Sequence, residues 1–451
     1  MKGDLTHGPV MRSMLLFALP MIAGNLLQQC YNIADTLIVG KFLGANALAA
    51  VGSAFTLMTF LTSILLGLCM GSGAAFSIRF GQRDEEGLKE RICTSFLLIG
   101  AITLLLNVAV FLLVDEILAF LRVPQEVWSM MREYLLVIFY GITATFLYNY
   151  FACLLRAVGN SVTSLLFLAV SSVLNIGLDL FFVLVLQRGV AGAAEATVIS
   201  QYVSGIGIAV YTWLRCPQLR VQRRHFRVRW SCVREIANFS LLTCVQQSVM
   251  NLGILMVQGL VNSFGPSVMA AFAAAVKIDA FAYMPVQDFG NAFSTFIAQN
   301  YGARKKERMQ AGLKGAVTAA FLFCVLVSLI IWIFARQLMT LFIDAGETQI
   351  IAEGVRYLHI EGAFYCGIGC LFLLYGLYRA VGRPEMSVVL TVISLGTRVA
   401  LAYLLSAIPA IGVVGIWWSV PIGWFLADAA GLGYYLLRKD RLFSWEQPLK
   451  E

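Results

Sequence analysis

Acidic and polar residues lie inside long apolar runs of this chain, and their presence in such runs requires a physical explanation. In the first run Gln28, Asn32 and Asp35 follow one another at spacings of four and three residues, which places them on one face of a helix. In a later run Asn175 and Asp179 stand four residues apart, again on one face. An ionisable group at the centre of a bilayer costs about 2.5–3.5 kcal/mol on insertion scales. Such faces should therefore meet one another or a wet cavity, not lipid.

The first half of the chain has internal acids without an internal base. Asp35 and Asp179 lie in its apolar runs, and no Lys or Arg lies in those runs. An uncompensated pair of carboxylates in a low-dielectric bundle either binds a cation or takes up a proton. We therefore predict a coupling-cation site for H⁺ or Na⁺ at Asp35, Asn175, Asp179 and Thr197, whose oxygens suit a hard cation. Hydrogen-bonded packing of the two acids is the alternative. We expect no cofactor and no other metal.

The second half differs, because its apolar runs hold charges of both signs. These are Lys277, Asp279, Asp288, Glu361, Arg398 and Asp428. We expect Lys277 and Arg398 to be held by carboxylates of this set, since an unpaired charge at membrane depth is costly. These acids are not copies of Asp35 and Asp179, so the predicted ion site belongs to the first half.

Further polar and aromatic side chains are candidates for a substrate cavity. They are Gln28, Asn32, Tyr148, Gln201, Gln246, Gln247, Asn251, Tyr283, Asp288 and Arg398. Aromatic faces attract organic cations, although aromatic residues in membrane helices also serve packing. Pro20 removes a backbone hydrogen bond from the first helix and is a candidate hinge.

The composition requires a membrane setting for these groups. Of 451 residues, 59% are hydrophobic and 13% are charged, whereas soluble proteins have about 25% charged residues. A spanning helix needs roughly 20 mainly apolar residues. Twelve runs qualify: 14–40, 46–72, 93–114, 133–154, 163–186, 190–214, 235–262, 269–296, 313–335, 355–377, 387–408 and 412–437. We predict an all-α integral membrane protein with twelve transmembrane helices.

The sequence repeats itself once. GKFLGANALAA at 40–50 resembles VNSFGPSVMAA at 261–271, a shift of 221, and RAVGN at 156–160 matches RAVGR at 379–383, a shift of 223. Each copy has six runs, so two six-helix lobes related by pseudo-two-fold symmetry are expected, as in transporters built from repeats. The predicted domains are an N-terminal lobe at 1–214, a basic linker at 215–234, a C-terminal lobe at 235–437 and a tail at 438–451.

The distribution of basic residues predicts the orientation. With the N-terminus inside, cytoplasmic segments hold 25 Lys and Arg residues and outer segments hold 6. Cytoplasmic loops carry an excess of such residues. We therefore expect both termini, the linker and the tail to be cytoplasmic, in a multi-pass protein of the cell inner membrane. The basic linker is interpreted as a tether beside lipid, not as a nucleic-acid site.

The sequence contains no cluster of cysteine or histidine residues that indicates a catalytic or metal site. The ten cysteines form no CxxC pair and the three histidines, His7, His225 and His359, are far apart. Neither a disulfide framework nor a zinc site is predicted. We predict no catalytic residue and no enzyme activity.

Several segments carry a resemblance to a known family. They are the Leu-Pro pair at Pro20, NIADTLIVGKFLG at 32–44, FGQRDEEGLKE at 80–90, RAVGN at 156–160, NIGLD at 175–179, GVAGAAEAT at 189–197, AAVKIDAFAYMP at 274–285 and QNYGARKKE at 299–307. At these residues the chain resembles the MATE (multidrug and toxic compound extrusion) family, particularly NorM- and DinF-like members. The resemblance implies two lobes, antiport of drugs against protons or sodium, and a first-lobe cation site at Asp35, Asn175, Asp179 and Thr197.

One departure from the family's pattern concerns the second lobe. Some members have a Glu on the seventh helix and an Asp on the tenth, where this chain offers Gln246, Gln247 and Glu361. This departure argues against a second-lobe cation site of that kind and leaves open whether the second lobe binds an ion.

The resulting hypothesis is a cation-coupled efflux antiporter that works by alternating access. Its partners would be small amphipathic compounds, cationic drugs or toxins among them, and the lipid bilayer, and we expect a monomer. The alternative is a lipid-linked saccharide flippase of the same superfamily. A flippase should line its cavity with several basic residues to meet pyrophosphate, and here only Lys277 and Arg398 are candidates.

Overall fold

The structure is a computed structural model that describes residues 3–121, 123–226 and 229–443. Its first half forms α1 (Val10–Leu43), α2 (Ala45–Gly81), α3 (Glu85–Leu112), α4 (Val114–Phe120), α5 (Gln125–Ile138), α6 (Gly141–Ala157), α7 (Val162–Leu180), the π-helical turn η1 (Phe181–Val185) and α8 (Gly189–Arg215). The 3-10 turns η2 (Pro217–Leu219) and η3 (Arg223–Phe226) follow. The second half forms α9 (Trp230–Asn262), α10 (Pro266–Gly302), α11 (Lys306–Met339), α12 (Thr348–Gly362), α13 (Tyr365–Ala380), α14 (Pro384–Ser406) and α15 (Val413–Leu442).

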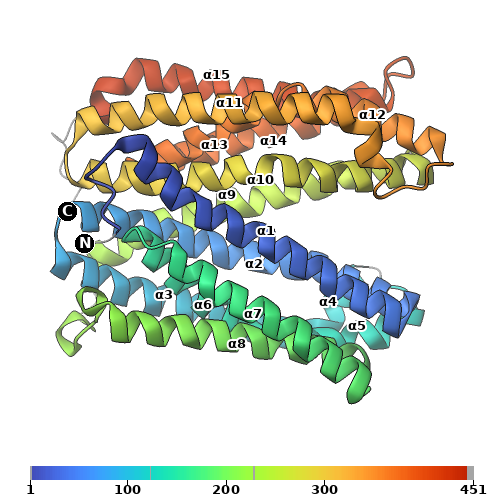
Figure 1. The fold of residues 1–451 in the computed structure, drawn as a ribbon, viewed down its shortest axis with the longest axis horizontal. Coiled ribbons are helices and arrows are strands. Elements are labelled where there is room, and N and C mark those ends of the chain that lie inside the picture. Colours follow the sequence, from blue (N-terminus) through green and yellow to red (C-terminus); the bar gives the residue numbers. More distant parts are fainter. Residues whose placement is uncertain (1–2, 122, 227–228, 444–451) are drawn as a thin grey trace. The chain divides into compact units, whose positions relative to one another are not determined.

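The described residues contain helices and no strand (Figure 1). Ten helices are long and apolar enough to cross a membrane. Two further spans are bent pairs, α5 with α6 at 47° and α12 with α13 at 51°. Together these elements give the twelve predicted spans, so the predicted fold class is confirmed. The bends divide the runs expected at 133–154 and 355–377, where no proline predicts a break.

The internal repeat is visible in the backbone. Left-handed φ angles recur at equivalent turns: 89° at Gly44 and 97° at Gly265, 60° at Arg83 and 57° at Arg304, 83° at Gly159 and 75° at Gly382, and 61° at Gly189 and 55° at Gly412. These pairs have the shifts of 221 and 223 found in the sequence. Arginine rarely adopts this conformation. Its presence in both α2–α3 and α10–α11 turns means that the two copies share turn geometry as well as helix order.

The chain forms two compact units, and their boundaries fall inside helices. Unit 1 comprises Met1–Asp4 and Leu19–Cys244, and unit 2 comprises Leu5–Ala18 and Val245–Glu451. The start of α1 therefore belongs to unit 2, and the start of α9 belongs to unit 1. Since α1 and α9 are the first helices of the two repeats, each unit contains the beginning of the other repeat's first helix.

Within unit 1, α2 packs on α3, α5 and α6, and α8 packs on α5, α6 and α7 (Figure 1). Two glycines of α2 allow a close approach of α9. A Cβ on Gly67 would lie 2.6 Å from the Cys244 Cα, and one on Gly71 would lie 2.2 Å from the Phe239 carbonyl oxygen. Small residues four positions apart let membrane helices pack closely. These glycines thus fix the first part of α9 in unit 1.

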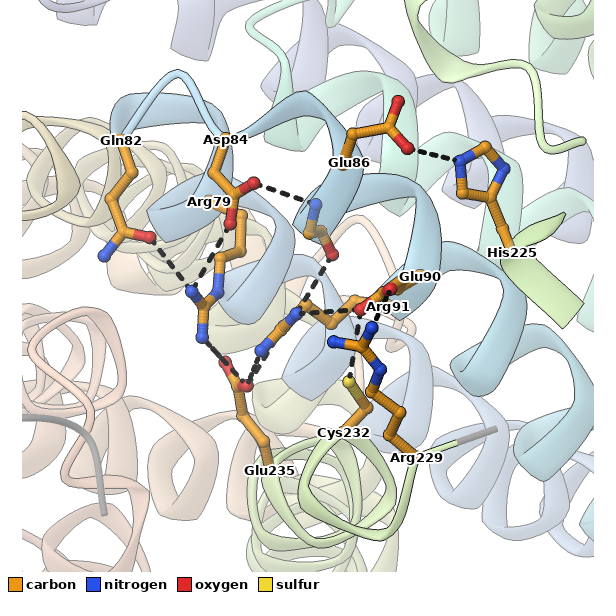
Figure 2. Close-up of polar contacts among 11 residues, drawn as sticks. Arg79, Gln82, Asp84, Glu86, Glu90, Arg91, His225, Arg229, Cys232 and Glu235 are labelled. Atoms are coloured by element: carbon orange, nitrogen blue, oxygen red, sulfur yellow. Dashed lines mark hydrogen bonds and ion pairs between the residues drawn. The ribbon is translucent and has the colours of Figure 1, made fainter. Parts of the chain in front are cut away.

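A charged cluster holds the α2–α3 turn, the linker and α9 together (Figure 2). The Glu235 carboxylate of α9 binds Arg79 at 3.1 Å and Arg91 at 2.7 Å. At the start of α3, Asp84 accepts a bond from the Gly87 N–H, which caps the helix. Glu86 binds His225 of η3 at 2.9 Å. The linker is thus held against α3 by side-chain bonds.

Within unit 2, α10 packs on α11, α12 and α13, and α14 packs on α13 and α15. The segment before α1 is bound to the α10–α11 turn. The Leu5 N–H donates to the Gln299 side chain at 3.0 Å, and Lys305 Nζ donates to the Thr6 carbonyl at 2.7 Å. Arg308 donates to the carbonyls of Leu5 and His7. Residues 5–8 are therefore an integral part of unit 2.

Candidate cation-coupling site

Asp35 of α1 and Asp179 of α7 come together in unit 1. Their carboxyl groups lie close enough to act on each other. Asp179 is fully buried, with 0% of its surface exposed, and Asp35 is half-buried. Two carboxylates so placed repel each other unless a proton or a cation lies with them. The sequence predicted this meeting from two separate helical faces.

Asn175 and Thr197 extend this site from α7 to α8. Asn175 stands one turn before Asp179 on α7, and its amide donates to the Thr197 hydroxyl of α8 at 3.3 Å. Thr197 in turn donates to the Ala193 carbonyl at 3.1 Å. The Asn175 carbonyl oxygen takes no part in this bond and is available as an acceptor.

The site has buried oxygens that lack a hydrogen-bond partner. Among the described residues, no partner is found for Asp35 Oδ1, Asn175 Oδ1 or either carboxylate oxygen of Asp179. Buried polar atoms without a partner are rare and costly. All of these atoms are acceptors, so a bound cation or proton is the kind of ligand that would satisfy them. The residues present therefore fit a small cation.

Two tyrosines that the sequence did not assign to this site border it. Tyr31 of α1 and the buried Tyr134 of α5 lie within electrostatic range of both Asp35 and Asp179. The Gln28 side chain lies beside the Tyr31 hydroxyl. Tyr31 stands four residues before Asp35, which is one helical turn. That spacing was the available signal, but a tyrosine in an apolar helix is equally expected in packing.

A change in helix type follows Asp179 directly. The π-helical turn η1 begins at Phe181, two residues beyond the acid. Such turns are uncommon and are often found at functional sites. No residue pattern predicts this turn, because the apolar run continues unchanged through residues 180–186.

Unit 2 contains a second group of buried charges. Asp279 of α10 and Glu361 of α12 interact with each other, and both lie near Arg398 of α14. Arg398 lies within electrostatic range of both acids, but no ion pair joins it to a carboxylate among the described residues and its Nε has no hydrogen-bond partner, so the expected pairing is not found. Lys277 is exposed and its Nζ lies 6.0 Å from the centre of the Phe342 ring. No carboxylate pairs with Lys277 among the described residues, contrary to our expectation, and its ammonium group lies over the Phe342 ring instead.

The predicted cavity residues divide between the units. Unit 1 contains Gln28, Asn32, Tyr148 and Gln201, and unit 2 contains Gln246, Gln247, Asn251, Tyr283, Asp288 and Arg398. Tyr148 donates to the Ser164 carbonyl at 3.0 Å, and Asn251 donates to the Gln247 carbonyl at 3.1 Å. Tyr283 lies near Asp279 and Arg398. Their role in binding substrate stays a prediction.

Comparison with known proteins identifies the family. The MatE family model matches residues 20–181 and 241–404, one segment in each repeat. The chain is 30% identical to the probable multidrug resistance protein YpnP of Bacillus subtilis (strain 168), over 96% of each chain. This protein therefore belongs to the MatE family of multidrug efflux transporters. It is a multi-pass membrane transport protein and not an enzyme.

Solved structures agree with this assignment. A multidrug resistance MATE family transporter of the MOP superfamily in an outward-facing conformation has a TM-score of 0.91 at 25% identity, covering 98% of this chain and 99% of that chain. A MOP superfamily transporter from Pyrococcus furiosus Vc1 (DSM3638), in which reverse polarity of the binding pocket suggests a different function, has the same TM-score, identity and coverage.

Proposed function

We propose that this transporter exports small amphipathic compounds in exchange for a cation, H⁺ or Na⁺, bound at Asp35, Asn175, Asp179 and Thr197. The observation that carries the proposal is the set of buried acceptor oxygens without partners on Asp35, Asn175 and Asp179. A cation or proton neutralises the carboxylates when bound and leaves them charged when released. Such a change of charge in a buried place alters which conformation is favoured, since a ligand shifts an equilibrium by its differential affinity.

The substrate class is supported by the relatives. YpnP is named a probable multidrug resistance protein, and one similar solved structure is a multidrug resistance transporter. An acidic and aromatic setting favours cationic, flat compounds. We propose drugs or toxins of this kind as substrates, transported by a monomer in the lipid bilayer.

Alternating access needs a place where the chain can bend. Pro20 lies within α1, two residues after Ala18, the last residue that α1 contributes to unit 2. Proline removes the backbone bond that would cross this point. We propose that α1 bends at Pro20 and moves Asp35 relative to α7 when the cation binds or leaves.

The orientation rests on the basic residues. The excess of Lys and Arg in alternate loops, 25 against 6, supports cytoplasmic termini and insertion in the cell inner membrane. The Arg-rich linker is then cytoplasmic as well.

The flippase alternative is less well supported. It needs basic residues free to meet pyrophosphate. Arg398 lies near Asp279 and Glu361, whose charge opposes binding of an anion there.

The proposed function is tested with the purified full-length protein in proteoliposomes under imposed proton and sodium gradients. Asp35→Asn and Asp179→Asn keep the side-chain shape and remove the charge, so each should abolish export against a concentration gradient. Binding of a fluorescent dye cation should persist, because the fold is intact. The control is Asp115→Asn, which removes an exposed acid on α4 paired with Arg132 and should leave export unchanged. Full gradient-driven export by either site variant would refute the proposed site.

A further inference from the structure

Residues 5–8, which precede α1 and are called the strap here, are bound along their backbone in unit 2. Leu5 and Thr6 have only 5% and 4% of their surface exposed. The side chains that bind the strap come from the end of α10, the start of α11 and the turn between them. A segment ahead of the first helix of a domain is usually poorly ordered unless it is tied down. The attachment of the strap therefore requires an explanation.

Arg308 of α11 binds three carbonyls of the strap. Its Nη2 donates to the Leu5 carbonyl at 3.1 Å and to the His7 carbonyl at 2.7 Å. Its Nη1 donates to the Gly8 carbonyl at 2.6 Å. The planar guanidinium presents its donors in a fixed arrangement, and charged donors form hydrogen bonds roughly twice as strong as neutral ones. A single side chain thus fixes the course of the strap.

The remaining backbone bonds come from neighbouring side chains. Lys305 Nζ donates to the Thr6 carbonyl at 2.7 Å, and Asn300 Nδ2 donates to the Leu5 carbonyl at 3.2 Å. The Leu5 N–H donates to the Gln299 side chain at 3.0 Å. All four carbonyls of the strap are therefore bound. Because the bound groups belong to the backbone, these bonds do not require particular side chains in the strap.

The charged side chains that bind the strap are particular to the second repeat. With the repeat shift of 221, Lys305 and Arg308 correspond to Asp84 and Gly87 of the α2–α3 turn. An ionised Asp84 is an acceptor and Gly87 has no side chain, so neither can bind a carbonyl in this way. The two turns nevertheless have the same backbone geometry. The strap-binding side chains are therefore an addition to a turn that both repeats share.

The start of α1 is held in the same unit, directly after the strap. A single residue separates the bound Gly8 carbonyl from Val10, where α1 begins. On one face of the helix Met14 and Phe17 have 0% and 4% of their surface exposed. Unit 2 includes α1 as far as Ala18. The strap and the start of α1 thus form one attached segment, which ends just before the proline of this helix.

We propose that the strap is an anchor for α1, which holds the start of this helix on the α10–α11 turn while the helix bends at Pro20. The inference rests on the proposed function, in which this bend moves Asp35. A bend changes the angle between two parts of a helix, and the part that is held determines which part moves. With the start of α1 held, the part that carries Asp35 moves. With the start released, the helix shifts as a whole, and cation binding no longer drives the movement.

Docking of the strap is tested by hydrogen–deuterium exchange of the full-length protein in detergent. The readout is the Leu5 amide, which is bonded to Gln299, together with the first turn of α1. Arg308→Ala removes three carbonyl contacts, so these amides should exchange roughly tenfold faster or more. Lys306→Ala is the matched control, because Lys306 is an exposed basic residue at the start of the same helix, and it should leave exchange unchanged.

The role of the anchor is tested in proteoliposomes by the amount of dye exported for each cation, H⁺ or Na⁺, that enters. Arg308→Ala should bind the coupling cation as wild type does, because the proposed site lies in unit 1, but it should lose most of its dye export per cation. His7→Ala keeps the bound carbonyl and should keep the wild-type ratio, as should Lys306→Ala. Unchanged strap exchange or an unchanged ratio in Arg308→Ala overturns the proposal.

A second variant gives a decision if Arg308→Ala does not fold. Lys305→Ala removes the bond to the Thr6 carbonyl and leaves Arg308 in place, so it should show both changes to a smaller extent. Wild-type exchange or a wild-type ratio in that variant overturns the anchor. Failure of the proposed function has a different result: wild type itself would show no cation-driven export, or Asp35→Asn would retain it.

Discussion

The Glu235 carboxylate of α9 accepts a hydrogen bond from the Arg91 guanidinium of α3, with 2.7 Å between Oε2 and Nη2. Arg79 of α2 binds the same carboxylate, so one acid joins three helices of unit 1 (Figure 2). The three side chains keep only 11–17% of their surface exposed. Screening by water is therefore weak, and the loss of the acid should be felt strongly.

Glu235→Gln should lower the free energy of unfolding by about 2–4 kcal/mol, because it removes the anion that lies nearest to two half-buried guanidinium groups and leaves them only the longer contacts to Asp84 and Glu90. Thermal unfolding in detergent measures the effect. The control is Glu307→Gln, at the position of α11 equivalent to Glu86 of α3, where the side chain is exposed. That change should stay within about 0.5 kcal/mol. Equal stability of the two variants would contradict the role of Glu235.

Gly71→Ala should separate α2 from α9. The added Cβ would lie 2.2 Å from the Phe239 carbonyl oxygen, and overpacking of this kind costs about 1–3 kcal/mol. Gly52→Ala is the control on the same helix, since its Cβ meets nothing within 4 Å. A helical Gly→Ala change there should stabilise by roughly 0.5–1 kcal/mol. The two alanines should therefore shift the melting temperature in opposite directions.

Pro20→Ala should restore a backbone hydrogen bond in α1 and stiffen this helix near the point where its residues change from unit 2 to unit 1. We expect slower export with unchanged or higher thermal stability. Pro421→Ala makes the same chemical change inside α15, which lies entirely in unit 2, and should leave the export rate near the wild-type value. Wild-type export by Pro20→Ala in a dye-efflux assay would exclude this hinge.

Thr197→Val should distinguish the two candidate coupling ions. Valine removes the hydroxyl that receives the Asn175 amide and leaves both carboxylates in place. A sodium ion loses a ligand by this change, whereas a proton needs only a carboxylate. We predict export driven by a pH gradient that survives in Thr197→Val. Loss of export that is restored by raising the sodium concentration would instead establish sodium as the coupling ion.

The sequence predicted those features that follow from hydropathy and periodicity. Asp35 and Asp179 could be placed on facing polar stripes because bilayer exposure of either is costly. Such reasoning predicts which face of a helix is polar, but it does not predict which residues of other helices lie beside that face. Tyr31 and Tyr134 were therefore missed as borders of the site. A tyrosine in an apolar helix can face lipid, pack in the core or border a polar site, and its position in the sequence does not distinguish these.

Breaks inside apolar runs were also beyond prediction. Phe139 and Tyr140 interrupt the fourth span, and no residue type there opposes helix formation. The proximity of Asp279 to Glu361 was missed because the two lie 82 positions apart on helices whose relative rotation depends on the packing of unit 2. Periodicity gives the facing direction of each helix only after its neighbours are known.

The first residues of α1 belong to unit 2 and those of α9 belong to unit 1. This arrangement constrains the order in which segments can dock during synthesis. Unit 1 is incomplete until the ribosome has synthesised Cys244, and residues 5–18 must wait for α10 and α11 before Leu5 and Thr6 find Gln299 and Lys305. Residues 5–18 are thus synthesised well before the helices on which they dock. A gene divided between α8 and α9 should yield two halves that each lack an essential helix start. Such halves should assemble only when both are produced in the same cell.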